Sequence, residues 1–194
     1  MKKIVMKTTF IILGAALLLV LISAGCAAVR GGYASAPFQV VRTEGDCQVR
    51  DYPALTLVAT PMQDDNHSFM RLFHYIDRQN SAQQKIAMTT PVFMTKGTNA
   101  SMAFVLPAAL PLAQAPQPAD GSVRLQEQPA GRFAVLRFSG GMSREHETNA
   151  LARLQVWLAK QSLTPVGEPI YGYFDPPWTP PFLRRNEVML RLLP

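Results

Sequence analysis

The stretch that decides the fold runs from residue 55 to residue 78 and reads LTLVATPMQDDNHSFMRLFHYIDR. Its first part, Leu55 to Met62, is rich in Val, Leu and Thr and favours a β-strand. From Ser68 the period changes to that of an amphipathic helix, whose apolar positions are Phe69, Leu72, Phe73 and Ile76. The pattern therefore predicts a strand followed at once by a helix over 68–78.

The same order of elements occurs twice along the chain, on the two sides of a proline-rich loop at 107–120. Each half has two strands, one helix and two further strands. The predicted ranges are 38–50, 55–62, 68–78, 85–95 and 101–106 in the first half, and 123–127, 132–139, 143–161, 170–174 and 188–192 in the second. Two ββαββ-like units predict an α+β fold, either a pseudo-twofold sheet or a distorted barrel, with two helices packed on it.

The N-terminus has the pattern of a targeting segment. Three lysines at positions 2, 3 and 7 precede an uncharged run from Thr8 to Val29, which is typical of a secretion signal. The run contains Ser23-Ala24-Gly25-Cys26, which resembles the lipobox of bacterial lipoproteins and makes Cys26 the candidate lipidation site, although Ser23 departs from the usual Leu. An uncleaved membrane anchor is the alternative. We expect residues 1–25 to be this segment and 26–37 a tether.

The globular domain is therefore expected at residues 38–194, on the far side of a bacterial membrane. Without the three N-terminal lysines the formal charge falls from +6 to +3, which argues against a nucleic-acid partner. Cys47 is the only cysteine of the domain, so no disulfide is expected, and its place in an alternating segment predicts a buried small residue. We expect a monomer.

The chain lacks the sequence patterns of common catalytic sites. It has no G-x-S-x-G elbow, and His146-Glu147 lacks the second histidine that zinc proteases require. His67, His74 and His146 form no ligand cluster with recognisable spacing. We therefore expect no enzyme. An enzymatic function requires a pocket that joins Ser143, His146 and Glu147.

Four short strings together resemble the SOUL haem-binding protein family, over about residues 38 to 192. The more specific two are Lys-Ile-x-Met-Thr-x-Pro-Val and the terminal Arg-Asn-Glu-Val. In this sequence the four strings are Gln48-Val49-Arg50-Asp51-Tyr52-Pro53, Lys85-Ile86-Ala87-Met88-Thr89-Thr90-Pro91-Val92, Phe138-Ser139-Gly140 and Arg185-Asn186-Glu187-Val188.

The resemblance implies a distorted eight-stranded antiparallel barrel of two repeats, flanked by two helices. It also implies a binder of haem or another tetrapyrrole without catalytic activity, which we interpret as a carrier or buffer. One departure concerns the end of the first helix, where the family tends to have glycine and this chain has Arg78. A charged residue thus occupies the expected left-handed cap.

The first helix also carries a candidate tetrapyrrole site on the side away from its apolar stripe. His67, Met70, Arg71, His74 and Arg78 follow one another at helical spacing. Met70 is expected to pack on the ring, and Arg71 or Arg78 to pair with propionates. His74 is the candidate axial ligand for iron. The alternative interpretation is a solvated polar helix face.

The sequence also allows two other functions. The stiff aromatic segment 173–182 contains Trp178 and Phe182, which either cover a ligand or contact a partner, or else cap the barrel end by becoming buried; we favour burial. An envelope interaction module is therefore one alternative. The other is a binder of different hydrophobic molecules, because the architecture resembles effector-binding domains of multidrug-responsive regulators. In each case we expect a periplasm-facing, membrane-anchored protein.

Overall fold

This computed structural model describes residues 32–193. The predicted signal segment at 1–25 and the candidate lipidation site Cys26 lie outside the described residues. Among the described residues, no helix is long and apolar enough to cross a membrane.

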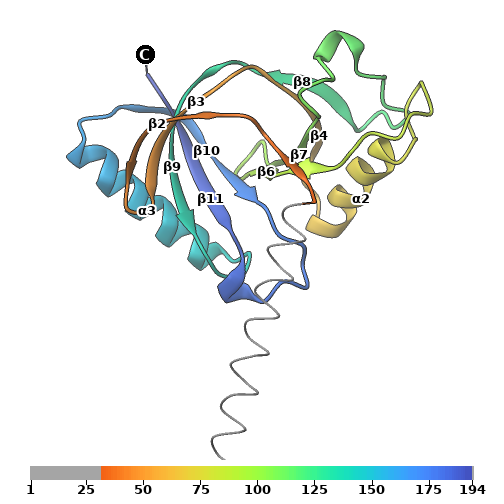
Figure 1. The fold of residues 1–194 in the computed structure, drawn as a ribbon. Helices are drawn as coiled ribbons and strands as arrows, with labels where there is room; N and C mark the ends of the chain where they lie inside the picture. Colours follow the sequence, from red (N-terminus) through yellow and green to blue (C-terminus); the bar gives the residue numbers. More distant parts are fainter. Residues whose placement is uncertain (1–31, 194) are drawn as a thin grey trace, which may run out of the picture. The chain divides into compact units, whose positions relative to one another are not determined.

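Nine strands form one sheet in which every neighbouring pair is antiparallel (Figure 1). Their order is β2-β3-β9-β11-β10-β6-β7-β4-β8. The strands are β2 Gln39–Glu44, β3 Cys47–Tyr52, β4 Leu55–Pro61, β6 Val92–Thr95, β7 Ser101–Val105, β8 Arg124–Gln128, β9 Gly131–Phe138, β10 Pro165–Tyr173 and β11 Asn186–Leu192. Two short strands, β1 Ala34–Ser35 and β5 Thr89–Thr90, pair in parallel as a separate ribbon.

The predicted eight-stranded barrel is wrong, because the sheet has nine strands and its two end strands, β2 and β8, do not pair. The sequence pattern predicts one strand over 38–50, but a turn at Gly45, with φ +57°, folds β2 back on β3. β2 therefore pairs with the edge of β3 that in a closed barrel of the other eight strands would pair with β8. Both halves do contain the ββαββ order of elements, and a pseudo-twofold relation between them stays a prediction.

Two tight links nevertheless bring the ends of the sheet toward each other. β3 and β4 lie near opposite ends of the strand order, yet only Pro53 and Ala54 connect them. Pro129 and Ala130 connect β8 with β9 in the same way. Because a two-residue link cannot cross a flat sheet of this width, the sheet must curl.

Two α-helices, α2 Asp65–Ile76 and α3 Arg144–Lys160, pack on one face of the sheet. α2 begins three residues earlier than predicted, because the Asp64 carboxylate caps it by accepting a hydrogen bond from the His67 amide. Ser143 caps α3, as predicted. Leu72 and Leu154 are completely buried in the core between the helices and the sheet, and the predicted burial of Cys47 is confirmed.

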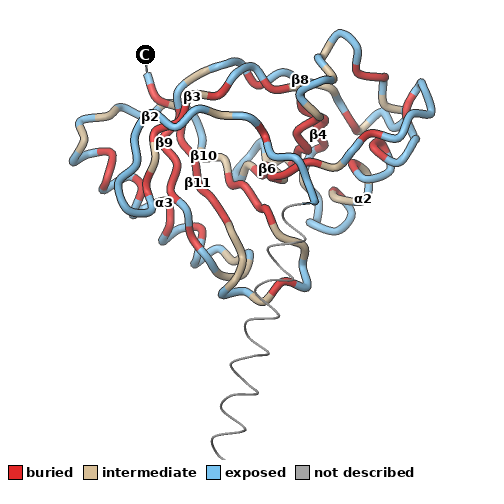
Figure 2. The backbone as a smooth tube through the Cα atoms, viewed as in Figure 1, coloured by how far each residue is buried: buried red, intermediate tan, exposed pale blue. Residues whose placement is uncertain are grey.

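The opposite face, which we call the inner face, is also buried although neither helix covers it. Its core includes Tyr52, Leu57, Phe93, Phe133 and Met189, contributed by strands from both ends of the order. Figure 2 shows buried residues along the central strands, whereas the end strand β2 is exposed. The curl of the sheet, rather than a second layer of helices, therefore excludes water from the inner face.

A buried cluster of charges lies on the inner face and joins two of the four motif strings. Arg50 forms a bidentate pair with Glu187, with nitrogen–oxygen distances of 2.7 and 3.0 Å. Arg185 donates to the same carboxylate at 2.7 Å, and Tyr52 accepts from Arg50 at 3.1 Å. Burial alone raises the pKa of Glu187, but its hydrogen bonds and its attraction to Arg50 outweigh burial and hold that pKa below its ordinary value.

The other two strings also serve the fold. The Asn186 amide donates to the Gly140 carbonyl at 3.0 Å, which ties the Phe-Ser-Gly string to the last strand. The Thr89 hydroxyl donates to the Val105 carbonyl, which fixes the middle string against β7. Pro91 separates β5 from β6, so the single strand predicted over 85–95 is interrupted there.

Candidate functional site

The four residues predicted to hold a tetrapyrrole lie on the outer side of α2 and at its end. Met70 is 38% exposed, and His74 and Arg78 are exposed. Arg71 is half-buried and donates to the Gln63 side chain at 3.0 Å. Helical spacing thus brings these side chains to one side of α2, and we call this surface the outer side of α2.

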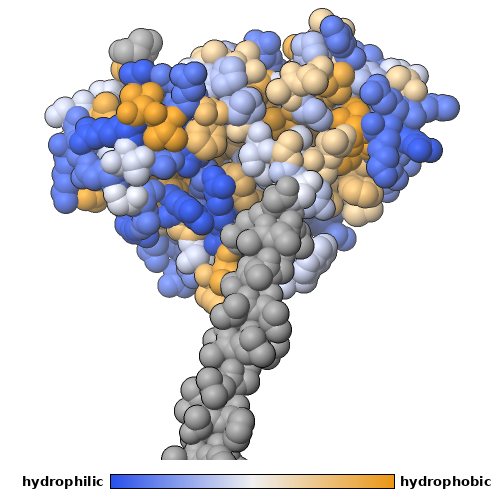
Figure 3. Space-filling model, in the orientation of Figure 1, coloured by the Kyte–Doolittle hydropathy of each residue, from blue (hydrophilic) through white to orange (hydrophobic). Residues whose placement is uncertain are grey.

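Phe73 is a second exposed apolar side chain of α2, although the sequence pattern predicts it in the core. The sequence analysis placed Phe73 in the apolar stripe, but it is 39% exposed. Its ring stacks on Phe69, with centroids 6.2 Å apart, and Phe69 in turn contacts the buried Phe104 edge to face. Figure 3 shows apolar residues bordered by hydrophilic ones on the side of the view where α2 lies. The predicted stripe of Phe69, Leu72, Phe73 and Ile76 therefore spans the boundary between core and surface.

Arg78 has the left-handed backbone conformation that the sequence predicted for this position, with φ +78°. The Gln79 amide donates to the His74 carbonyl at 2.9 Å and the Asp77 amide to the Phe73 carbonyl at 2.8 Å. These bonds close the helix in the manner of a Schellman motif. A left-handed conformation costs an L-residue about 1–2 kcal/mol, so the position holds arginine at the expense of stability.

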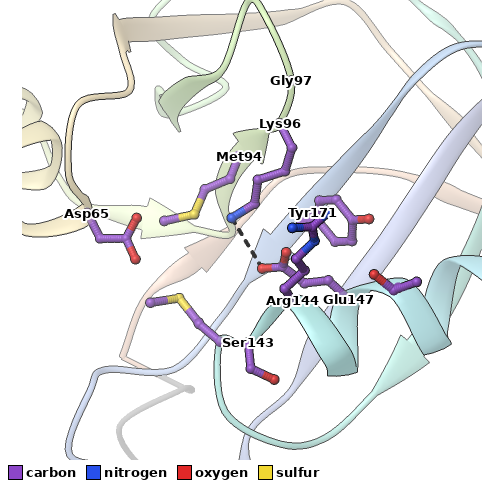
Figure 4. A pocket seen from close by; sticks show the side chains of 10 residues that line it. Asp65, Met94, Lys96, Gly97, Ser143, Arg144, Glu147 and Tyr171 are labelled. Atoms are coloured by element: carbon purple, nitrogen blue, oxygen red, sulfur yellow. Dashed lines mark ion pairs between the residues drawn. The ribbon is translucent and has the colours of Figure 1, made fainter.

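A separate pocket of about 410 Å³ lies on the helix-covered face, between the beginnings of α2 and α3 (Figure 4). We call it the helix pocket. Its walls combine charged side chains with methionines and a tyrosine. They are Asp65, Met94, Lys96, Gly97, Met142, Ser143, Arg144, Glu147, Thr148 and Tyr171. Of the α2 residues only Asp65 lines it, and helical spacing places Asp65 away from the outer side of α2.

Glu147 is the buried charge of the helix pocket. Its Oε1 atom accepts a 2.5 Å hydrogen bond from the Tyr173 hydroxyl and lies 3.3 Å from Lys96 Nζ, the ion pair drawn in Figure 4. Lys96 is 42% exposed, whereas the Glu147 side chain is 9% exposed. Burial, followed by the hydrogen bond to Glu147, raises the pKa of Tyr173 well above its ordinary value. The pocket thus has one fixed, buried carboxylate and one solvent-exposed counterion.

The sequence pattern did not predict this pocket, although one residue on α3 pointed to it. The apolar stripe of α3 runs through Ala150, Leu154 and Leu158, and Glu147 lies on the same stripe one turn earlier. A carboxylate at a core position needs a buried partner. That partner, Tyr173, is 26 residues away, and spacing alone does not reveal it.

Of the three residues named for an enzymatic site, Ser143 contacts His146, whereas Glu147 is paired with Tyr173 and Lys96. Ser143 Oγ and the Gly141 carbonyl both lie within hydrogen-bond distance of His146 Nδ1, at 2.9 and 3.1 Å. Ser143 also caps α3. Ser143 and Glu147 line the helix pocket but His146 does not. Among the described residues no group of His, Cys, Asp and Glu could hold a metal ion.

The aromatic segment at 173–182 is more exposed than the sequence analysis favoured. Trp178 is 80% exposed and Phe182 65% exposed, so neither caps the sheet by becoming buried. Arg184 holds the segment by donating to the Thr179 carbonyl at 2.8 Å and to the Pro177 carbonyl. The Gly140 amide donates to the Pro181 carbonyl, which brings this segment close to the turn before α3.

Comparison with known proteins gives one family. The profile described as SOUL heme-binding protein matches residues 33–191, which is most of the chain. No curated relative matches the sequence.

Solved structures resemble this fold at low sequence identity. The C-terminal domain of EcmrR superposes with a TM-score of 0.53 at 14% identity, covering 80% of this chain and 98% of that one. EcmrR in a complex with DNA gives 0.54 at 15% identity, covering 75% of this chain and 56% of that one. A hydrolase from Listeria innocua gives 0.57 at 8% identity, covering 79% and 94%. These likenesses concern the fold.

Proposed function

We propose that this chain, which belongs to the SOUL heme-binding protein family, binds haem or another tetrapyrrole on the outer side of α2. The observation that carries this proposal is that Met70 and Phe73 each expose about two-fifths of their surface on a helix that also carries Arg71 and His74. A tetrapyrrole presents an apolar disc and two carboxylates. Met70 and Phe73 suit the disc, and Arg71 and Arg78 suit the carboxylates.

His74 lies on the same side of α2, one turn after Met70, and is the candidate axial ligand. Haem supplies an iron that accepts a nitrogen or sulfur ligand when it is bound. We propose that contact with the disc and the carboxylates dominates binding, with ligation by His74 as a smaller contribution. The chain then acts as a carrier or buffer without catalytic activity.

The cellular setting belongs to the same proposal. The basic and apolar pattern of residues 1–25 supports export, with attachment to the membrane through a lipid on Cys26 or through the uncleaved segment itself. The domain then faces the periplasm of a bacterial envelope as a monomer. Labelling of the intact protein with a radioactive fatty acid, compared with Cys26→Ser, tests the lipid; equal labelling of both contradicts it.

Haemin titration of the full chain in lipid nanodiscs tests the site, with empty nanodiscs subtracted. We expect a saturable Soret band whose affinity falls about 2- to 30-fold in the double variant Arg71→Ala/Arg78→Ala, because each of the two exposed ion pairs contributes about 0.2–1 kcal/mol. The matched control is Arg124→Ala/Arg137→Ala, which removes two exposed arginines elsewhere on the sheet. Equal affinities in the two double variants contradict the site, and an unsaturable signal contradicts the function.

The helix pocket supports a second candidate function, the binding of other small amphiphilic molecules. Its methionines and Tyr171 offer apolar contacts, and Lys96 and Arg144 lie at its wall. Such a mixture of apolar lining and a few polar groups is typical of ligand pockets.

The fluorescent anion anilinonaphthalene sulfonate is a suitable probe of this second function. We expect Lys96→Met/Arg144→Met to weaken dye binding several-fold, whereas Arg71→Ala/Arg78→Ala leaves it unchanged. If the haemin affinity instead follows the Lys96 and Arg144 changes, the tetrapyrrole site belongs in the helix pocket.

A further inference from the structure

The link between β10 and β11 carries the two most exposed aromatic side chains of the described residues. Trp178 is 80% exposed and Phe182 65% exposed. They belong to the eight-residue stretch 176–183, PPWTPPFL, which contains four prolines and no charged residue. We call this stretch the aromatic tip. Figure 1 shows it at the lower edge of the domain. Exposed apolar groups of this size mark contact with another apolar surface.

The backbone of the aromatic tip has few free polar groups. Its four prolines have no amide hydrogen, and the amides of Thr179 and Leu183 donate within the tip at 3.0 and 2.9 Å. Five of its eight carbonyls accept hydrogen bonds, and they are those of Pro176, Pro177, Thr179, Pro180 and Pro181. Paired backbone groups leave water at a lower cost than free ones. The tip can therefore enter a less polar medium without unfolding.

The aromatic tip begins at the end of the sheet where the N-terminal part of the chain enters the domain. Strand β1 pairs with β5, and Pro91 alone separates β5 from β6. Val92, where β6 begins, pairs with Tyr173, where β10 ends. The tip starts three residues after Tyr173. The sheet register thus places the base of the tip beside the point of entry.

The membrane attachment proposed above would keep this point of entry close to a bilayer. Ala34 begins β1, eight residues after the candidate lipidation site Cys26. Eight extended residues span at most about 26–29 Å. An uncleaved membrane span over 8–29 leaves a still shorter tether. In either case the aromatic tip stays within reach of the membrane surface.

We propose that the aromatic tip is a second, noncovalent membrane contact, in which Trp178 and Phe182 enter the headgroup region of the bilayer that holds the N-terminus. This inference rests on the proposed membrane attachment. Tryptophan is typical of membrane–water interfaces, where its ring has apolar contacts and its N–H a polar partner. The tip has no carboxylate that must lose its hydration, and the next residue is the cation Arg184. Two contacts instead of one fix which side of the domain faces the membrane.

Tryptophan fluorescence tests this contact, because the chain has two tryptophans and Trp157 is 8% exposed. In full-length Trp157→Phe all tryptophan emission comes from Trp178. The protein is reconstituted in nanodiscs of phosphatidylethanolamine and phosphatidylglycerol, with either ordinary or brominated acyl chains. We expect brominated lipid to quench Trp178 several-fold and acrylamide, which stays in the water, to quench it weakly.

The matched control places a tryptophan at another exposed apolar position. In the background Trp157→Phe/Trp178→Phe, the change Val156→Trp puts it on α3, where Val156 is 57% exposed. We expect acrylamide to quench this tryptophan strongly and brominated lipid to leave it unchanged. Phe182→Ser in the Trp157→Phe chain should reduce quenching of Trp178 by lipid, because it removes the second aromatic anchor. If Trp157→Phe fails to fold, the difference between the spectra of the wild type and Trp178→Phe isolates the emission of Trp178.

Flotation of the full chain with liposomes separates this inference from the proposed attachment. A chain that floats, but whose Trp178 is not quenched by brominated lipid, keeps the attachment and overturns the second contact. A chain that does not float overturns both. Protection of Trp178 from acrylamide without quenching by lipid indicates contact with a second copy of the chain, and this result also overturns the membrane contact.

Discussion

The charge cluster around Glu187 and the outer side of α2 both place arginines beside apolar side chains, but they differ in every other respect. Arg50 and Glu187 are 4% and 2% exposed and bind each other directly. Arg71 and Arg78 are part-exposed or exposed, and α2 presents the apolar side chains of Met70 and Phe73 to solvent. The first region has satisfied its charges within the protein, whereas the second presents them outward.

This difference explains why the family strings identify the fold better than they identify a ligand site. Arg50, Glu187, Asn186 and Thr89 all belong to those strings. Arg50 binds Glu187 across strands, Asn186 donates to the Gly140 carbonyl before α3, and Thr89 donates to the Val105 carbonyl on β7. None of the four strings includes a residue of α2. In this chain the strings therefore hold the curled sheet together, and none of them supplies a side chain of the proposed tetrapyrrole site.

The largest effect is expected from breaking the buried pair. Glu187→Gln leaves Arg50 charged and buried without its counterion, which should lower the free energy of unfolding by roughly 3–5 kcal/mol. Urea denaturation followed by circular dichroism measures it. The matched control is Asp51→Asn, which breaks the exposed pair between Asp51 and Arg132 and should leave the unfolding midpoint nearly unchanged.

A double variant sharpens this prediction. In Arg50→Met/Glu187→Leu both buried charges are absent. The free energy of unfolding should therefore fall by less than the sum of the losses in the single variants Arg50→Met and Glu187→Leu. If the losses simply add, the two side chains do not depend on each other, and the assignment of the cluster as a coupled buried pair is wrong.

Acid provides a second way to break the same pair. The pKa of Glu187 is below its ordinary value in the folded protein, so the pair stabilises the fold above the unfolded-state pKa of about 4.3. That stabilisation is lost as the pH falls through the lower folded-state pKa. The stability difference between the wild type and Glu187→Gln should therefore shrink between pH 5 and pH 3. A difference that stays constant over this range contradicts the role of the Glu187 carboxylate.

Much of the fold could be predicted from local pattern. The strand over 55–62, both helices and the Ser143 cap depend on side chains within a few positions of one another, and all are present. The closure of the sheet could not be predicted in this way. It depends on whether β3 pairs with β2 or with β8, and the turn at Gly45 decides that pairing through one residue.

The candidate sites divide in the same way. Helical spacing was sufficient to place Met70, Arg71 and His74 on one side of α2. It was not sufficient for the helix pocket, where Glu147 meets Tyr173 from a strand that is 26 residues away. A polar residue at a core position of α3 was the available signal there.

Haemin binding by the outer side of α2 can be weakened without a loss of folding stability. Met70→Glu removes apolar contact and places a carboxylate near the propionates, so haemin affinity should fall roughly tenfold while the free energy of unfolding changes by less than about 0.5 kcal/mol. Val156→Glu is the matched control, since Val156 is an exposed apolar residue on α3. A comparable loss of haemin affinity in both variants indicates nonspecific adsorption and contradicts a site on α2.

The smallest expected effect concerns the ends of the two helices, because each helix is followed by a residue in the left-handed backbone conformation. Arg78 follows α2 and Ser162 follows α3, with φ +78° and +54°, and in each case the next amide donates back to a carbonyl in the last turn. Glycine adopts this conformation without the steric cost, although it also raises the conformational entropy of the unfolded chain. Arg78→Gly and Ser162→Gly should each raise the free energy of unfolding by about 0.5–1 kcal/mol, measured by urea denaturation.

The two substitutions separate strain from function. Ser162→Gly should leave haemin affinity unchanged, because Ser162 lies at the end of the other helix. Arg78→Gly should weaken it several-fold, because it removes a cation from the outer side of α2. If Arg78→Gly stabilises the protein and binds haemin as the wild type does, the strained arginine has no part in ligand binding, and Arg71 alone is left to pair with a propionate.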